Sequence, residues 1–399
     1  MRYRAILLSA LLVVSMVGTA AAPAAAQSAE GEAYAGTHVE FDQQSNAVAD
    51  YAVDGNVIVE NVTMQSAGEA RSQTGIGVET SVGAALAADI VGATIGSRSQ
   101  TDASVTLGFE SGGEMQTHDT QRGVVQFQAT DGNQVVAVNV SSNADAQAES
   151  DERVVVTKDD GSQGAFIVVG EGSVAVDDNG DVTAEVYEDS QLVYRQYNDE
   201  RSENDEEAEQ MIQNGTATAE VYVQQSAESG GETAVEAIEY GNDTSVEVAS
   251  TAENEINMTV ERTRSQGKVV LTSVSEAAFE NAEDLTVTVD GEAAAQADSY
   301  SAVEQSATEG DQPRYYVAQS SSAEATVDVA IGIDHFSARN VQLSSQDDAT
   351  PTEDGSTATE SESTETQSPD DSSQGDGAGF GALAALAALA SSLIAARHR

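Results

Sequence analysis

The chain contains no cysteine and no tryptophan, and only 16 of its 399 residues are basic, against 68 that are acidic. The absence of cysteine excludes disulfides, thiol catalysis and a lipid anchor attached to cysteine. The formal net charge of -52 excludes nucleic-acid binding, because no basic patch exists to meet phosphates. The candidate functions are therefore those that need neither thiols nor a basic surface.

The acidic residues are spread along the whole chain rather than gathered in one segment. Like charges at this density repel one another in dilute buffer, whereas in molar salt the Debye length falls to about 3 Å and the repulsion is screened. Hydrophobic residues still make up 40% of the chain, more than an acidic disordered protein usually contains. We interpret the composition as that of a folded, halophilic, haloarchaeal protein.

The N-terminal residues have the organisation of a secretory signal peptide. Arg2 and Arg4 precede an apolar stretch over residues 5–17, and Ala24-Ala25-Ala26 fits a small-residue cleavage site. Tyr3 separates the two arginines, which favours general secretion over the twin-arginine route. The pattern predicts a signal peptide over residues 1–26 and an exported mature protein.

The C-terminal residues predict a membrane anchor on a spacer. Residues 377–396 carry no charge and consist mainly of alanine and leucine. A helix of about 20 residues spans roughly 30 Å, close to the hydrocarbon thickness of a bilayer. Residues 346–376 are rich in Ser, Thr, Asp and Glu and contain no basic residue, which predicts a disordered stalk, a composition also found in O-glycosylated stalks.

Residues 377–399 resemble the PGF-CTERM type of archaeal protein-sorting signal. The helix and basic end of that family match residues 384–399, and Ala378 stands where the family has proline. The positions that carry the motif are Ala378, Gly379, Phe380, Arg397 and Arg399. The resemblance implies that an archaeosortase removes the helix and that an attached lipid holds the protein at the S-layer face of the membrane.

Period-two alternation of apolar and polar residues dominates residues 27–345 and predicts an all-β ectodomain of one to three subdomains. Asp54-Gly55, Asn179-Gly180 and Asp290-Gly291 supply turns between strands. The fold class is a β-sandwich-like domain or domains, or a β-solenoid, with a few short helices. The predicted strands are residues 57–63, 103–109, 124–128, 134–140, 165–169, 182–187, 219–223, 256–260, 285–289 and 326–333.

Few segments predict helices. Residues 203–213 are helix-prone and end at an Asn-Gly pair, and Ser273 with Glu276, and Ser301 with Glu304, form capping boxes. Residues 76–95 fit both periods, and their glycines favour strands. The pentad Thr-Ala-Glu-Val-Tyr occurs at residues 183–187 and again at 218–222, a spacing that would favour a solenoid if it were general.

Modification and metal binding have candidate residues, whereas no motif points to a cofactor. Five sequons predict N-glycosylation, at Asn61, Asn139, Asn214, Asn242 and Asn257. Oxygen ligands that suit calcium cluster at Asp177, Asp178, Asn179 and Asp181. The spacing is not that of an EF-hand, so a polar hairpin turn is the favoured interpretation. His38, His118 and His335 are isolated in the sequence, and no nucleophile elbow is present.

Three functional hypotheses follow. The first is a non-enzymatic, S-layer-associated cell-surface glycoprotein with a structural or adhesive role. The second is a surface-tethered module that binds carbohydrate, metal or a partner protein. The third, the least favoured, is an exported hydrolase.

Overall fold

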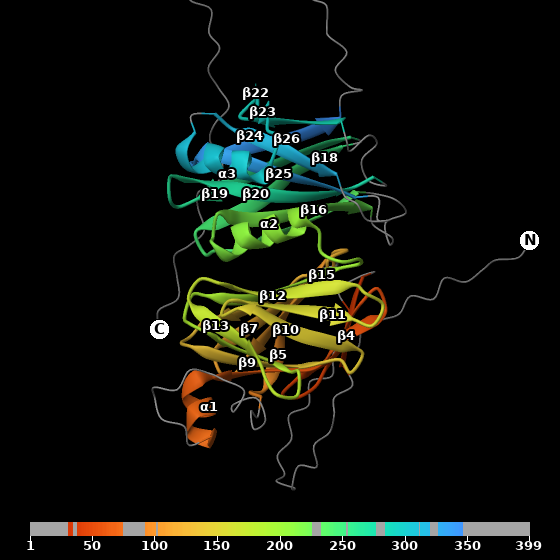
Figure 1. Ribbon diagram of the computed structural model, residues 1–399. Coiled ribbons are helices and arrows are strands. Elements are labelled where there is room, and N and C mark those ends of the chain that lie inside the picture. Colours follow the sequence, from red (N-terminus) through yellow and green to blue (C-terminus); the bar gives the residue numbers. More distant parts are fainter. Residues whose placement is uncertain are drawn as a thin grey trace, which may run out of the picture. The chain divides into compact units, whose positions relative to one another are not determined.

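Four β-sheets make up the described part of the chain (Figure 1). The computed structural model describes residues 31–34, 38–74, 92–100, 103–225, 233–252, 254–276, 284–310, 312–319 and 326–345. All of them belong to one compact unit that ends at Ala349. Because successive side chains of a strand point to opposite faces, the alternating sequence gives each sheet an apolar face to bury.

The first sandwich packs a seven-stranded sheet against an eight-stranded sheet, both antiparallel throughout. Met64 and Phe166 lie in the core between them. The seven-stranded order is β1 (Gly31–Tyr34), β2 (Val39–Gln43), β3 (Val48–Val53), β4 (Asn56–Ser66), β9 (Gln134–Val140), β14 (Val182–Val186) and β13 (Gly172–Val176). The eight-stranded order is β10 (Ala144–Ser150), β11 (Arg153–Lys158), β12 (Gln163–Val169), β15 (Gln191–Tyr197), β8 (Val125–Ala129), β7 (Gly113–His118), β6 (Ser104–Phe109) and β5 (Ile95–Gln100).

The second sandwich packs a six-stranded sheet against a five-stranded sheet around a core that includes Val270 and Leu343. Its pairs are antiparallel except β16 with β20 and β23 with β24. The six-stranded order is β17 (Thr233–Glu239), β16 (Ala217–Gln225), β20 (Gln266–Ser275), β25 (Thr326–His335), β24 (Arg314–Gln319) and β23 (Ala295–Gln296). The five-stranded order is β18 (Thr244–Ala252), β19 (Glu255–Arg262), β26 (Arg339–Ser345), β21 (Leu285–Val289) and β22 (Glu292–Ala293).

A third core joins the two sandwiches. Ile167 on β12 and Leu271 on β20 bury their side chains in it, although each strand also contributes residues to the core of its own sandwich. Helices α2 (Glu203–Gln213) and α3 (Tyr300–Glu309) supply Ile212 and Val303 to the same cluster. Strand β15 is buried along its whole length because both of its faces are covered.

The third helix, α1 (Ala67–Thr74), lies away from this interface and contacts β4 and β9. Of the described helices, all within residues 31–345, none is both long and apolar enough to cross a membrane.

The sequence predicted much of this architecture. The all-β, sandwich-like fold is confirmed, and each of the ten predicted strands is present. The helix predicted over residues 203–213 is α2. The turns at Asp54-Gly55 and Asp290-Gly291 place both residues at positive φ, between 50° and 81°, as a tight hairpin turn requires.

Of the two predictions from capping boxes, one is wrong and the other misplaces the start of its helix. Ser273 begins no helix; it lies within β20, which pairs with β16 on one side and β25 on the other. Pairing on both edges and burial of the strand outweigh a local capping signal. Helix α3 exists, but its N-cap is Ser299, which is extended and accepts from the Ala302 N–H, so Ser301 lies inside the first turn.

The repeated pentad does not mark a structural repeat. Its first copy lies in β14 except for its last residue, Tyr187, and β14 has two antiparallel neighbours in the first sandwich. Its second copy lies in β16, which is parallel to one neighbour in the second sandwich. The four sheets pack face to face, so the solenoid interpretation has no counterpart among the described residues.

Several predictions fall on residues outside those described. These are the signal peptide over residues 1–26, the stalk over 346–376, the sorting and transmembrane segment over 377–399, and most of the ambiguous stretch 76–95.

Removing the N-cap of α2 should destabilise the protein measurably. The Ser202 hydroxyl accepts from the Asp205 N–H at 3.2 Å, and the Asp205 carboxylate accepts from the Ser202 N–H at 2.9 Å. Ser202→Ala should therefore lower the free energy of unfolding by about 1 kcal/mol in urea titrations at molar KCl. Ser142→Ala, at an exposed loop serine, is the control, and equal effects of the two variants would contradict the role of the cap.

Candidate functional site

The interface between the two sandwiches carries a buried ion pair. Arg195 on β15 donates from Nη2 to Glu220 Oε1 on β16 at 2.6 Å, and the two side chains are 2% and 3% exposed. Arg195 points away from the core of its own sandwich because its neighbour Tyr194 points into that core. Burial disfavours the guanidinium charge, but Glu220 and the neighbouring tyrosines together outweigh it, so the pKa of Arg195 is raised well above its ordinary value.

Two tyrosines complete the surroundings of Glu220. Tyr222 donates its hydroxyl to Oε1 at 2.8 Å, and Tyr240 donates to Oε2 at 2.6 Å. Burial, and then the Glu220 carboxylate, raise the pKa of both phenols well above the ordinary value, so they stay protonated and act as donors. The carboxylate thus has three donors in a water-poor region, which is the condition for a stable buried charge.

A second arginine ties three elements together. Arg122 contacts Asp205 at the start of α2 at 3.0 Å and Asp328 on β25 at 2.5 Å. Its guanidinium carbon lies 5.0 Å from the centroid of the Tyr197 ring. Burial lowers the pKa of Arg122, but Asp328 and Asp205 reverse the effect, and the pKa is raised well above that of a free guanidinium.

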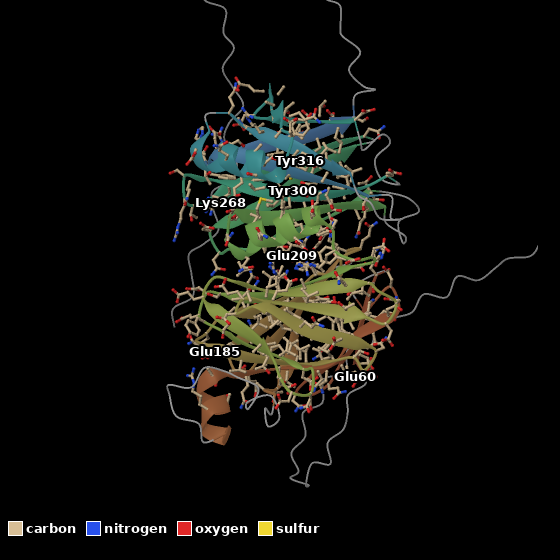
Figure 2. The ribbon with its side chains drawn as sticks, in the orientation of Figure 1. Glu60, Glu185, Glu209, Lys268, Tyr300 and Tyr316 are labelled. Carbon is tan, nitrogen blue, oxygen red and sulfur yellow. The ribbon has the colours of Figure 1, made fainter. Side chains whose placement is uncertain are left out.

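Glu209 forms the other end of this charged layer, on the face of α2 that meets the eight-stranded sheet. It accepts from the Tyr197 hydroxyl at 2.8 Å and from Arg201 at 3.0 Å, and Arg153 lies 3.4 Å away. Burial raises the pKa of Glu209 in spite of these arginines. Figure 2 places Glu209 between the helix and the sheet. Four of the chain's few basic residues therefore lie at one interface: Arg122, Arg153, Arg195 and Arg201.

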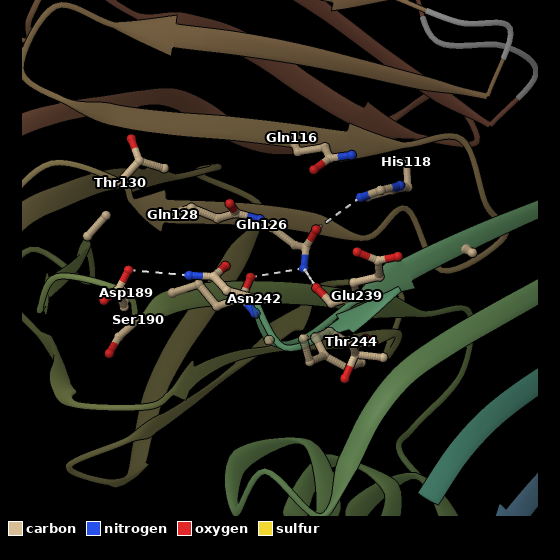
Figure 3. A pocket seen from close by; sticks show the side chains of 15 residues that line it. Gln116, His118, Gln126, Gln128, Thr130, Asp189, Ser190, Glu239, Asn242 and Thr244 are labelled. Atoms are coloured by element: carbon tan, nitrogen blue, oxygen red, sulfur yellow. Dashed lines mark hydrogen bonds between the residues drawn. The ribbon is translucent and has the colours of Figure 1, made fainter. Parts of the chain in front are cut away.

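A polar cavity of about 510 Å³ opens beside this layer (Figure 3). The first sandwich contributes β7, β8 and the start of β15, and the second contributes the end of β17, the connection after it and Thr244. Amide side chains dominate the lining, which comprises Gln116, His118, Gln126, Gln128, Ala129, Thr130, Asp189, Ser190, Gln191, Ala237, Glu239, Tyr240, Gly241, Asn242 and Thr244. This volume is typical of small-molecule sites, but the polarity is unusual, since such sites are mostly apolar.

One hydrogen-bonded chain crosses the cavity wall. Gln126 Nε2 donates to Gln191 Oε1 at 2.9 Å and to the Glu239 carbonyl of the other sandwich at 2.7 Å. Its Oε1 therefore faces His118 Nε2, at 3.1 Å, and His118 Nδ1 faces Glu236 Oε1 at 2.6 Å. Both ring nitrogens of His118 therefore have an oxygen within hydrogen-bond distance.

Two carboxyl groups, of which that of Glu239 is half-buried, determine the charge of the cavity. Burial raises the pKa of this carboxyl, and a hydrogen bond from the Val246 N–H opposes the shift. Asp189 contributes a second carboxylate, and the basic lining residue His118 is directed to Glu236. The cavity can therefore offer hydrogen-bond donors and acceptors to a neutral ligand, and its charge disfavours anions.

The structure brings two of the five sequon asparagines together, because Asn61 on β4 and Asn139 on β9 are paired across neighbouring strands. Asn61 on β4 and Asn257 on β19 are half-buried, and Asn139 at the end of β9 is exposed. Asn214 caps the C-terminus of α2 and is exposed. Asn242 is exposed and lines the cavity, where its Nδ2 donates to Asp189 Oδ1 at 3.3 Å.

The calcium candidates form the β13–β14 hairpin. Asp177 Oδ1 accepts from the backbone N–H groups of Asn179 and Asp181, at 2.8 and 2.9 Å. Asp181 accepts from the Val140 N–H and from Asn139, while Asp178 is exposed. Within residues 31–345, the described part of the chain contains no group of three or more His, Asp or Glu arranged for a metal. The carboxylates of Asp177 and Asp181 stabilise a turn, as the favoured interpretation expected.

The sequence did not identify the interface residues. One indication of them was present in the sequence, a single charged residue within an otherwise uncharged strand. Arg195 is the charged residue of Gln191–Tyr197 and Glu220 that of Ala217–Gln225, and basic residues are few in this chain. The sorting residues Ala378, Gly379, Phe380, Arg397 and Arg399 lie outside the described residues.

Comparisons with known proteins leave the family open. No family model matches the chain, and a search of curated proteins found no match. Among solved structures, a mutant of a glycoside hydrolase of family 81 from Clostridium thermocellum aligns with 11% identity and a TM-score of 0.36. The alignment covers 78% of this chain and 35% of that one, so the chain spans about a third of its length. A likeness at this level assigns neither a fold family nor an activity.

Proposed function

We propose that this chain is an exported cell-surface glycoprotein of a halophilic archaeon with a structural or adhesive role. The order of segments in the chain supports this location. Residues 1–26 have the features of a signal peptide, and a folded region, an acidic stalk and an uncharged run follow, with Arg397-His398-Arg399 directly after that run. Export places the sequons where glycosylation occurs, and the C-terminal segment retains the protein at the membrane.

The fold of residues 31–345 is suited to a structural role. The third core and the ion pairs of Arg122 and Arg195 join the two sandwiches into one body. A load applied to either sandwich therefore passes through packed side chains rather than a linker. The acidic composition keeps such a body hydrated and soluble in molar salt.

Ligand binding is the second candidate function, because the interface cavity is a hollow lined by amide side chains. Carbohydrate fits this lining better than a metal ion or a partner protein, because each sugar hydroxyl both donates and accepts hydrogen bonds.

Deleting residues 377–399 tests the location. The truncated protein should move almost entirely from the envelope fraction to the culture medium, as measured by immunoblotting of both fractions. Deletion of the stalk, residues 346–376, is the control and should leave the protein in the envelope. Retention of the truncated protein in the envelope would contradict the anchoring role.

Mass spectrometry of the mature C-terminus distinguishes two forms of anchoring. Removal of the helix and a lipid near Gly379 and Phe380 would support processing by an archaeosortase. An intact Arg399 would contradict processing and indicate a permanent single-pass anchor. The variant Ala378→Pro, which restores the proline of the family motif, should then increase the processed fraction.

A further inference from the structure

Asn242 brings a glycosylation sequon to the interface cavity. The sequon is Asn242-Asp243-Thr244, and its asparagine and threonine both line the cavity. The Nδ2 atom, which N-glycosylation modifies, lies 3.3 Å from Asp189 Oδ1 (Figure 3). A glycosylated amide keeps one N–H, so a sugar on Asn242 leaves this hydrogen bond available. Any saccharide on Asn242 therefore begins at the cavity.

The first sandwich presents hydrogen-bonding groups to the same space. Gln116 on β7 and Gln128 on β8 line the cavity, and their side-chain amides bond no other described residue. Each offers a carbonyl acceptor and two N–H donors, which match the hydroxyl groups of a sugar ring. The register places these two residues on one face of neighbouring strands, where Gln128 pairs with Glu114 and Gln126 pairs with Gln116. The amides therefore form a short polar row.

The charge of the cavity restricts the class of sugar. Asp189 and Glu239 both line it, and His118 is directed to Glu236. A uronic acid or a sulfated sugar would bring a third negative group beside these carboxyl groups. A neutral hexose or N-acetylhexosamine meets the same donors and acceptors without that repulsion.

We propose that a neutral saccharide linked to Asn242 folds back into the cavity, where Gln116 and Gln128 hold it. The linked sugar adds contacts between the end of β17 and the outer face of the eight-stranded sheet, and so fastens the two sandwiches at one edge. This inference rests on the glycoprotein part of the proposed function.

Hydrogen exchange of the full-length native protein, combined with glycopeptide mass spectrometry, tests the proposal. Asn242→Gln should remove the glycan and speed exchange in residues 237–244 about tenfold, because β17 is an edge strand. Gln116→Ala with Gln128→Ala should keep the glycan and raise the same exchange. The matched controls are Asn214→Gln, at a sequon outside the cavity, and Gln147→Ala, at an exposed glutamine of β10; neither should change exchange in residues 237–244.

The outcomes separate the sources of the saccharide. A glycan on Asn242 whose removal leaves exchange unchanged would overturn the proposal, as would an unmodified Asn242 beside other glycosylated sequons. Five unmodified sequons would refute the glycoprotein assignment as well. A free saccharide is tested by titrating the Asn242→Gln protein with glucose, mannose, galactose and N-acetylglucosamine. If one of these sugars binds saturably, and Gln116→Ala with Gln128→Ala in the same unglycosylated protein abolishes the binding, the cavity is a site for a free saccharide instead.

Discussion

Replacing Arg195 with methionine is expected to lower the free energy of unfolding by about 3–5 kcal/mol. The variant removes the charged partner from Glu220, whose side chain is 3% exposed, and leaves the carboxylate with the Tyr222 and Tyr240 hydroxyls as donors. A buried carboxylate without its cation keeps most of its desolvation penalty. Urea titrations followed by circular dichroism at molar KCl measure the loss.

A double variant and a surface variant make the result specific. Arg195→Met with Glu220→Gln should recover more than half of the loss, because the amide needs no counter-charge. Its oxygen can accept from one phenol and its NH2 group can donate to the oxygen of the other. Arg98→Met removes a partner from Glu114 at a site where the arginine is 52% exposed, and it should change stability by less than about 1 kcal/mol. Equal losses from Arg195→Met and Arg98→Met would contradict the role assigned to the buried pair.

Strands with one solvated face could be predicted from the sequence, because burial of one face leaves a visible alternation. Residues 285–289, for example, alternate between buried and half-buried positions in β21. The hairpin turns could also be predicted from the sequence, because Asp290-Gly291 adopts the positive φ angles that few other residue pairs tolerate. Residues that are adjacent in the chain determine both the alternating strands and the tight turns, so both can be predicted from the sequence.

Not every strand that is covered on both faces could be predicted, and β15 is the clearest case. All seven positions of β15 are buried, and its sequence mixes glutamine, tyrosine and arginine with leucine and valine. No period-two pattern survives when both faces need partners, and polar residues enter because a buried network satisfies them. The false helix start at Ser273 has the same origin, since β20 is also covered on both faces.

The candidate site could not be predicted from the sequence, because the residues that form it are far apart along the chain. Arg122 meets Asp328, which is 206 positions away, and Gln126 meets the Glu239 carbonyl, 113 positions away. Apart from the sequon at Asn242, neither side of the cavity contains a sequence motif. The sequon at Asn242 was visible in the sequence, but its position opposite a row of glutamines followed only from the packing of the two sandwiches.

Transfer to low salt is expected to unfold the protein. With a formal net charge of -52, mutual repulsion opposes the compact state, and the screening length grows from about 3 Å at 1 M salt to about 10 Å at 0.1 M. A stability of about 5–15 kcal/mol is small beside repulsion among that many charges. We expect cooperative unfolding at room temperature below about 0.5 M KCl. Tyrosine fluorescence reports it without interference, because the chain has no tryptophan.

Sucrose and the Arg195 variant separate screening from other effects of salt. Sucrose strengthens burial by exclusion from the protein surface but screens no charge, so it should not replace KCl in keeping the protein folded. The Arg195→Met loss should be nearly the same at 1 M and 3 M KCl, since a pair that is 2% and 3% exposed lies beyond the reach of mobile ions. A transition temperature that stays constant between 0.1 M and 3 M KCl would contradict the halophilic interpretation, whereas a salt-dependent Arg195→Met loss would show that ions reach the interface.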